Sequence, residues 1–475
     1  MRYLSLLLLI FLNHITIAQE INRPKEGPAF FFNSFQHYSD SNKDSALYFI
    51  RKLGDDKSPY SYTTLQDLLH NFFGQRFLSK WEEEIKDSAE LAFMNKSRTI
   101  GYQILDEIRK DINPVLAGSA KPIWLWTQAM NQKANITALT NITTEFLALE
   151  QPVKDIYTDR LGRYGLLIWQ EIQSKKELQP LANKLFGSIF TKLKTNQLII
   201  NTDTASRKLK ERRTWYRYLF AYANFIKATQ LQAKRNYKEA GPYFKSAFEH
   251  SPDKDDNNNP SAFFYDMHYL LQKEKRSFRE DYLNFLVSSG EDINKTLAVL
   301  LDMALNNPSS KEQLRAYYEK NFSGGDPFSN YWLKNINTSL KPAPAFSLEQ
   351  IDGTKFSTSA HINKWILLDF WGTWCTPCRK EHPDLQKFYD EIKGEQPQKI
   401  ILVTIACRDS ESKVGTYMKE FNYNFPVAMA DSNIEKNYNI SSYPSKILIT
   451  PQGKFLVVPF GTDWVDFIKK YADLE

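Results

Sequence analysis

Two cysteines near the C-terminal end of the chain stand two residues apart, in the run Trp374-Cys375-Thr376-Pro377-Cys378. Thiols at this spacing can close a small disulfide and reopen it, and the thiolate is the form that attacks another disulfide. An apolar strand is expected just before this run, over 365–371, and a helix just after it. Cys375 would then lie at a helix N-terminus, where the helix dipole and free N–H groups stabilise a thiolate. The pattern predicts thiol–disulfide exchange.

The chain has only one other cysteine, Cys407, in its 475 residues. A zinc site would need about four N or S ligands, and no second C-x-x-C motif supplies them. A structural disulfide framework would need many more cysteines. We therefore expect no metal and no other cofactor. Cys407 follows a predicted buried strand and is expected to be a small buried residue, with a redox-responsive third thiol as the alternative.

The first 18 residues have the pattern of a signal peptide. A basic start at Arg2 precedes a leucine-rich run over 3–12, and small residues over 16–18 allow cleavage before Gln19. The apolar run is too short to span a bilayer, although a membrane anchor or a buried first helix is the alternative. The pattern predicts export to the periplasm, an oxidising compartment.

Composition predicts a globular protein of two to four domains. The chain is long, and 14% of its residues are aromatic. The formal net charge is +6, with the densest basic run at 207–213. Such a run is more often a solvated helix face than a nucleic-acid site, so we expect no nucleic-acid partner.

The pattern of apolar residues changes near residue 340. Residues 19–340 carry apolar residues at three- and four-residue spacing, which predicts a mostly helical region. Pro180 should split one of these helices in two. Residues 251–260 have no periodicity and predict a loop, and 341–344 predict a stiff linker. The clearest predicted helices are 81–94, 141–149, 164–193 and 209–233.

One part of the helical region, near 224–253, resembles a tetratricopeptide unit. Ala240, Phe244, Ala247 and Pro252 stand at the spacing of that family, where small residues let two helices pack closely. One copy of the repeat favours irregular helical hairpins over a regular array. A region of this kind can bind a protein or peptide, or have a purely structural or dimerising role.

Residues 341–475 alternate between strand and helix patterns, which predicts an α/β domain with a central mixed sheet flanked by helices. Pro377 stands where a helix tolerates proline, and Pro383 should kink the same helix. Asp463 can cap the last helix. The predicted strands are 346–348, 365–371, 399–406, 446–450 and 454–458, and the predicted helices are 376–392, 412–421 and one that follows Asp463.

Several short motifs of residues 341–475 together match one known family. They are Pro344-Ala345-Phe346-Ser347-Leu348, Asp352-Gly353, the run 370–379, Pro383, Ser442-Tyr443-Pro444-Ser445 and 449–453. With these motifs, the domain resembles the thioredoxin-fold, TlpA/ResA-like exported thiol-disulfide oxidoreductases of the AhpC/TSA redoxin superfamily. Some members of that group carry such a domain after a long helical region. The resemblance therefore implies the thioredoxin fold and protein-disulfide oxidoreductase activity.

Exchange chemistry and the resemblance give the two cysteines different roles. Cys375 is expected to be the nucleophile, partly exposed, which forms a mixed disulfide with the substrate. Cys378, one helical turn on, is expected to be the more buried resolving thiol. Its attack releases the substrate and leaves a Cys375–Cys378 disulfide, and the closeness of the two sulfurs makes this step effectively unimolecular.

Three further positions take expected roles mainly from the resemblance. It implies a cis peptide bond at Tyr443-Pro444, beside the cysteines, where the substrate backbone would pair. Asp369 stands at the place of the buried carboxylate of thioredoxins and would carry the proton of Cys378, or it faces a polar pocket without a catalytic role. Trp374 is expected to shield the disulfide.

Glu381 and His382 follow on the predicted helix and are expected to be solvated rather than catalytic.

The resembled group implies a reductase that accepts electrons from a membrane donor and reduces exported proteins such as apo-cytochromes. A disulfide oxidant or isomerase is the alternative. A peroxidase is less favoured, because Gly372 and Leu368 stand where peroxiredoxins carry Thr and Pro. A helical binding module with the thioredoxin domain as a docking platform is the non-enzymatic alternative, and two intact cysteines argue against it.

Overall fold

The computed structural model describes most of the chain in two compact units. The division falls inside helix α12 (Arg207–Ala233), so the first unit ends at residue 220 and the second holds the described residues from 221 onward. The predicted signal peptide, residues 1–18, and the predicted loop after residue 251 lie outside the described residues. The domain boundary near residue 340 stays a prediction. The described residues are 27–73, 87–149, 159–202, 207–251, 277–290, 292–322, 324–394 and 397–472.

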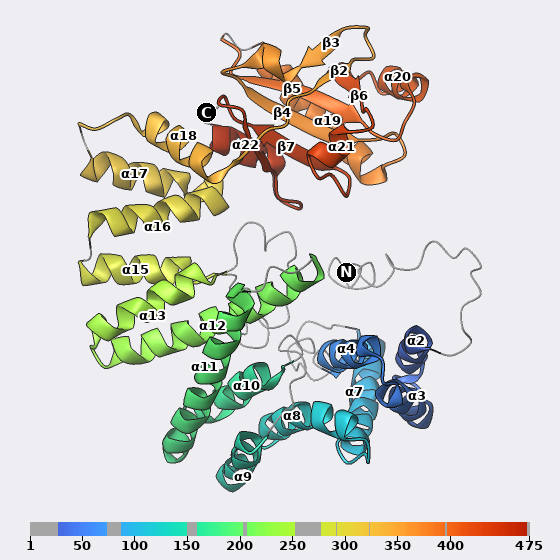
Figure 1. Ribbon diagram of the computed structural model, residues 1–475, viewed down its shortest axis with the longest axis vertical. Coiled ribbons are helices and arrows are strands. Elements are labelled where there is room, and N and C mark those ends of the chain that lie inside the picture. Colours follow the sequence, from blue (N-terminus) through green and yellow to red (C-terminus); the bar gives the residue numbers. More distant parts are fainter. Residues whose placement is uncertain are drawn as a thin grey trace. The chain divides into compact units, whose positions relative to one another are not determined.

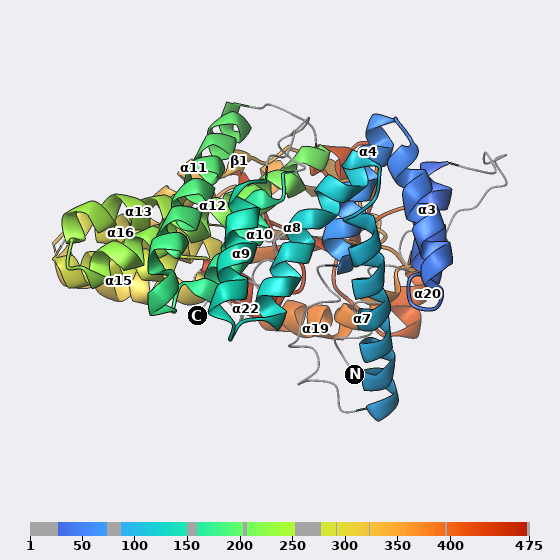
Figure 2. The same ribbon diagram turned by 90° about the horizontal axis from the view of Figure 1, so that it is seen from below.

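The first unit is built of helices that pack against their neighbours along the chain. Helices α8, α9, α10 and α11 contact one another as a group, and their apolar faces form its core (Figure 2). The helices of this unit are α2 (Pro28–Tyr38), α3 (Lys43–Asp55), α4 (Pro59–Leu68), η1 (Leu69–Phe73), α7 (Ser88–Ile108), α8 (Pro114–Asn131), α9 (Ile136–Leu147), α10 (Leu161–Ile172), η3 (Lys176–Leu178), α11 (Gln179–Thr202) and the first part of α12.

The helix break predicted at Pro180 is confirmed. Helix α10 ends at Ile172 and α11 begins at Gln179, so Pro180 lies in the first turn of α11. Its missing N–H costs no intrahelical hydrogen bond there. Part of the helix predicted over 81–94 lies outside the described residues.

The second unit begins with helices that lead into the C-terminal domain (Figure 1). At the repeat near 224–253, Ala228 of α12 and Ala240 and Ala247 of α13 are fully buried. The two helices are joined by a short turn in which Arg235 has a φ of 58°. These helices are α13 (Tyr237–Glu249), α15 (Arg279–Ser289), α16 (Ile293–Asn306), η6 (Pro308–Ser310), α17 (Lys311–Asn321) and α18 (Phe328–Ser339).

The last of these helices are bonded to the end of α22 (Trp464–Ala472). The Trp332 indole N–H donates to the backbone carbonyl of Tyr471 at 2.9 Å, and the two rings meet edge to face. The Lys311 ammonium donates to the carbonyl of Lys470 at 2.8 Å. One continuous hydrophobic core joins these helices to the sheet.

The C-terminal domain is a mixed six-stranded sheet in the order β1-β8-β7-β4-β5-β6, with a separate β2–β3 hairpin. Strands β4, β5 and β6 are parallel, and β7, β8 and β1 add antiparallel pairings. The predicted α/β domain with flanking helices is confirmed. Its strands are β1 (Lys341–Pro342), β2 (Ser347–Glu349), β3 (Lys355–Ser357), β4 (Trp365–Trp371), β5 (Ile400–Ala406), β6 (Val427–Met429), β7 (Ser445–Ile449) and β8 (Lys454–Val457), and its helices are η7 (Thr358–His361), α19 (Thr376–Ile392), α20 (Glu411–Glu420), α21 (Ile434–Asn437) and α22.

The linker predicted at 341–344 is partly wrong, because Lys341 and Pro342 pair with β8 as an edge strand. Proline is tolerated there since an edge strand leaves one side without a partner.

Strand β4 is buried on both faces, as its continuous apolar run predicts. Side chains alternate between the faces. Leu367 and Trp371 share a core with α19 and α22, whereas Leu368 and Phe370 share a core with α21 and the hairpin. Asp369 therefore points to the face that α19 covers. A helix able to cross a bilayer is not found in the part of the chain that the structure describes.

Candidate active site

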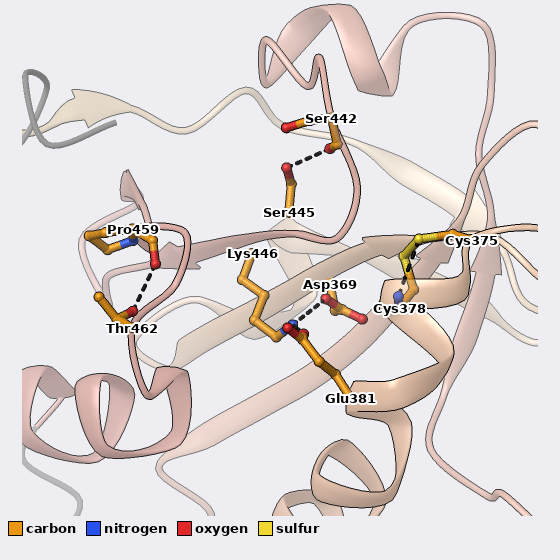
Figure 3. A network of polar contacts seen from close by, with 9 residues as sticks. All are labelled: Asp369, Cys375, Cys378, Glu381, Ser442, Ser445, Lys446, Pro459 and Thr462. Carbon is orange, nitrogen blue, oxygen red and sulfur yellow. Dashed lines mark hydrogen bonds and ion pairs between the residues drawn. A yellow bond between two sulfur atoms is a disulfide. The ribbon is translucent and has the colours of Figure 1, made fainter. Parts of the chain in front are cut away.

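The two cysteines form a disulfide at the start of α19, directly after β4 (Figure 3). Cys375 is the N-cap residue, and its Sγ accepts a hydrogen bond from the backbone N–H of Cys378 at 3.3 Å. Pro377 lies in the first turn, where it removes no helical hydrogen bond. The helix N-terminus is thus directed at the sulfur that is expected to act as nucleophile.

Both cysteines of the disulfide are buried. Cys375 is 4% exposed and Cys378 is 1% exposed. Cys378 is the more buried of the two, as expected, but the expectation that Cys375 is partly exposed is wrong for the oxidised protein. The reason is that its Sγ turns onto the N-terminus of α19 and into the disulfide.

Trp374 stands over the loop before the disulfide and is half exposed. Its indole N–H donates to the carbonyl of Cys407 at 3.1 Å, and its ring meets Tyr443 edge to face. Gly372 makes this arrangement possible, because a Cβ there would lie 2.4 Å from the Trp374 Nε1. The shielding role expected of Trp374 stays a prediction, and the steric role of Gly372 is a feature that the sequence did not reveal.

The peptide bond between Tyr443 and Pro444 is cis, as the resemblance implies. The Tyr443 hydroxyl donates to the Glu435 carboxylate, and the Arg408 guanidinium lies over the Tyr443 ring. Arg408 also pairs with Glu435 at 3.2 Å. Burial and the nearby carboxylate raise the pKa of Tyr443, so its hydroxyl remains a donor and fixes the loop that carries Pro444.

Asp369 is buried and lies beside a lysine that the sequence analysis did not single out. The Lys446 ammonium is 3.0 Å from Asp369 and 2.5 Å from Glu381 (Figure 3). Burial alone would lower the pKa of Lys446, but these two carboxylates raise it. A lysine at the start of the apolar stretch 446–449 is the signal that could have revealed it.

The expectation that His382 is solvated is wrong. The side chain is buried between Trp371 and Phe425, and its Nδ1 lies 2.8 Å from the Tyr417 hydroxyl. Burial, together with the charges of Lys446 and Arg379, lowers the pKa of His382 to about 4. His382 is therefore a neutral core residue, placed there because the buried face of α19 repeats at 378, 382 and 385.

The expectation for Glu381 is also incomplete, since it is only partly exposed and is bound to Lys446.

Cys407 is fully buried at the end of β5, and its thiol is free. Burial, with a smaller contribution from Glu435, raises the pKa of Cys407 to about 12. The thiol is protonated at neutral pH and is a poor nucleophile. This agrees with the predicted small buried residue rather than with a redox-responsive thiol.

A shallow pocket of about 320 Å³ borders the loop before the disulfide and lies between α19 and α20. Its lining offers hydroxyl groups and charges of both signs. Within the described residues, no group of three or more His, Cys, Asp and Glu side chains is arranged to hold a metal ion. The pocket is lined by Thr373, Arg379, Ser412, Lys413, Thr416, Tyr417 and Glu420.

Several known proteins are similar to the C-terminal part of the chain. Residues 340–457 match the AhpC/TSA family. The thiol-disulfide oxidoreductase ResA of Bacillus subtilis is 35% identical over 133 residues, which cover 28% of this chain and 73% of ResA. The thioredoxin-like protein YneN of the same organism is 28% identical over 158 residues, which cover 32% of this chain and 91% of YneN.

Among solved structures, a thioredoxin-family thiol:disulfide interchange protein of Chlorobium tepidum is 28% identical, with a TM-score of 0.26, over 28% of this chain and 94% of that protein. The similarity to ResA thus covers nearly three quarters of that enzyme. The chain therefore belongs to the ResA family of thioredoxin-fold thiol-disulfide oxidoreductases.

Proposed function

We propose that this oxidoreductase works as a reductase of disulfides in exported protein substrates. The observation that carries the proposed direction is the burial of Cys378, at 1% exposure on the inner face of α19. A thiolate in such a place is poorly hydrated, which destabilises the reduced form relative to the disulfide. Oxidants of this fold gain their oxidising power from a stabilised reduced form, so burial favours the opposite direction.

In the proposed cycle, the Cys375 thiolate attacks a substrate disulfide and forms a mixed disulfide. Cys378 then loses its proton to Asp369 and attacks the Cys375 sulfur. The substrate leaves with the electron pair as a thiolate and takes up a proton, and the Cys375–Cys378 disulfide remains. Trp374 and the backbone at Tyr443 and Pro444 would contact the substrate chain.

The proposal has three further parts. Residues 1–18 are a signal peptide, the protein is exported to the periplasm, and a membrane protein supplies its electrons. The helical region over 19–340 would bind a protein or peptide. N-terminal sequencing of the protein from the cell envelope tests the first part, and the expected first residue is Gln19.

The reduction potential of the Cys375–Cys378 couple tests the direction. The purified full chain would be equilibrated with defined ratios of reduced and oxidised dithiothreitol. A value at or below about −270 mV, as for thioredoxin, supports the reductase. A value near about −120 mV would make the protein an exported oxidant or isomerase.

Substrates can be captured in the cell with the Cys378→Ala variant, because its mixed disulfides through Cys375 cannot resolve. The double variant Cys375→Ala/Cys378→Ala is the control, since it has no active-site thiol and can form no mixed disulfide at the site. Exported proteins bound only to the single variant would support the proposal, and an absence of such adducts would count against a protein substrate.

A further inference from the structure

One buried lysine in the domain is shared by two carboxylates next to the disulfide. Lys446 of β7 is 6% exposed, and its ammonium lies 3.0 Å from Asp369 of β4 and 2.5 Å from Glu381 of α19. In Figure 3 the Asp369 carboxylate lies between Lys446 and the cysteine pair. A lysine ammonium is costly to bury unless its charge is compensated, so the buried position of Lys446 needs a physical reason.

The fold brings the three side chains together from three elements. Asp369 and Lys446 are direct partners in the antiparallel register of β4 and β7, so their side chains stand on one face of the sheet. That face is the one that α19 covers. Glu381 lies three residues after Cys378, and residues at this spacing share one side of a helix.

The charges around Lys446 do not balance. Two carboxylates face one ammonium, and the remaining side is closed by the Trp464 ring of α22 at 4.9 Å, which brings no charge. His382 of α19 is neutral at physiological pH. Arg379, also on α19, lies over the ring of Tyr417 instead. Lys446 is therefore the cation shared by the buried Asp369 and the partly exposed Glu381.

We infer that Lys446 is a positioning residue of the redox centre, which holds the Asp369 carboxylate in place as the acceptor of the Cys378 proton while Glu381 shares the charge of the lysine. This inference rests on the proton transfer proposed above and holds for either direction of electron flow. Without Lys446, the carboxylates of Asp369 and Glu381 would lose the ammonium that they share, and like charges close together repel each other.

The step that depends on Lys446 is the second exchange. The Cys378 S–H bond breaks and its proton goes to Asp369. The Cys378 sulfur forms a bond to the Cys375 sulfur, and the bond from Cys375 to the substrate sulfur breaks. The substrate sulfur leaves with that electron pair, so the substrate is reduced and the cysteine pair is oxidised.

The test uses the reduced full chain and the coloured disulfide dithiobis(nitrobenzoate) in a stopped-flow instrument. Each of the two exchange steps releases one coloured thiolate, so they give two phases, the first from Cys375 and the second from Cys378. In Lys446→Met we expect the second phase to slow by about tenfold or more at neutral pH, and its pH midpoint to rise by about one unit. The first phase should change little, and Lys446→Arg should restore part of the rate.

Glu381→Gln is the second variant, and Glu381 is partly exposed, so the domain should tolerate it. Lys446 would then serve Asp369 alone, and the pH midpoint of the second phase should fall. Lys355→Met is the matched control, because Lys355 pairs with Glu349 at the surface of the same domain. A purely structural role of Lys446 would affect both phases without opposite shifts of the midpoint.

Unchanged midpoints in both variants, or shifts in the same direction, would overturn the inference. A wild-type protein that lacks the second phase would instead contradict the proposed cycle itself.

Discussion

Gly372 leaves room for the indole of Trp374, because it has no side chain. A Cβ at this position would lie 2.4 Å from the Nε1 of Trp374 and 3.0 Å from the Cys407 carbonyl oxygen. We predict that Gly372→Ala displaces the indole and breaks its hydrogen bond, at a cost of about 1 kcal/mol.

The indole N–H resonance of Trp374, assigned with Trp374→Phe, measures this change. It should move toward the position of a solvent-exposed indole. Gly415→Ala is the control, since a Cβ there meets no atom within 4 Å, and an unmoved resonance in Gly372→Ala would contradict the steric argument.

His382 should make the stability of the domain depend on pH. Its folded pKa of about 4 lies below the unfolded value of about 6.5. The unfolded chain therefore binds the proton first, and stability is lost as the pH falls from about 6.5 to about 4, by about 3 kcal/mol at most.

The ring resonances of His382 report this directly when the pH is titrated. A midpoint near 4 is expected, and a midpoint near 6.5 would contradict the burial of the ring. In His382→Phe, the part of the acid destabilisation that falls in this pH window should disappear.

Cys407 should remain unreactive in the folded protein. Its pKa is raised to about 12 by burial, so almost no thiolate is present at neutral pH. After reduction of the chain, iodoacetamide should label Cys375 rapidly and Cys407 only after unfolding, as mass spectrometry can follow. Rapid labelling of native Cys407 would revive the redox-responsive interpretation.

Individual site residues can be predicted from the sequence where a reactive residue type stands at a spacing typical of its chemistry. Cys375, Cys378 and the cis bond before Pro444 could be predicted, because a motif marks each of them. Lys446 and the buried His382 could not, since their surroundings come from strands and helices distant in the sequence. A polar residue in an amphipathic pattern looks solvated until its neighbours are known.

Among the elements, strand β4 and helix α19 begin and end where the sequence predicts. Each is long and has a clear signal, an apolar run for β4 and a cap with proline for α19. Strands β1, β3 and β6 were missed, because each has only two or three residues and is defined by its pairing partner.

Ser251 links the end of α13 to the start of α15. Its buried hydroxyl donates to the carbonyl of Ala247 and accepts from the backbone N–H of Phe278. We predict that Ser251→Ala costs about 1–3 kcal/mol locally, because the Phe278 amide loses its buried partner.

Hydrogen exchange of residues 278–283, followed by mass spectrometry, should become faster in Ser251→Ala. The exposed Ser288→Ala serves as the control and should leave exchange unchanged. Equal exchange in Ser251→Ala and the wild type would show that another group satisfies the amide.

At the scale of the whole molecule, Trp332 of α18 should stabilise helix α22, which it contacts 139 residues later in the chain. It is 2% exposed, its ring contacts Tyr471, and its N–H binds the Tyr471 carbonyl. We predict that Trp332→Ala destabilises this contact by about 3–5 kcal/mol.

The readout is the hydrogen exchange of residues 464–472 in the full chain, which should become faster. The exposed neighbour Asn330→Ala is the control. Unchanged exchange in Trp332→Ala would mean that α22 is stable without the preceding helices.

The bonds from Lys311 and Trp332 to the carbonyls of Lys470 and Tyr471 lie at the C-terminal end of α22. The last carbonyls of a helix have no partner within it, and a positive charge there is favourable. Helix α22 thus receives its C-terminal cap from helices encoded more than 130 residues earlier. A recombination that transferred residues 341–475 alone would remove this cap from α22. We therefore expect the C-terminal region to be exchanged more readily, in evolution or in engineering, when helices α17 and α18 are transferred with it.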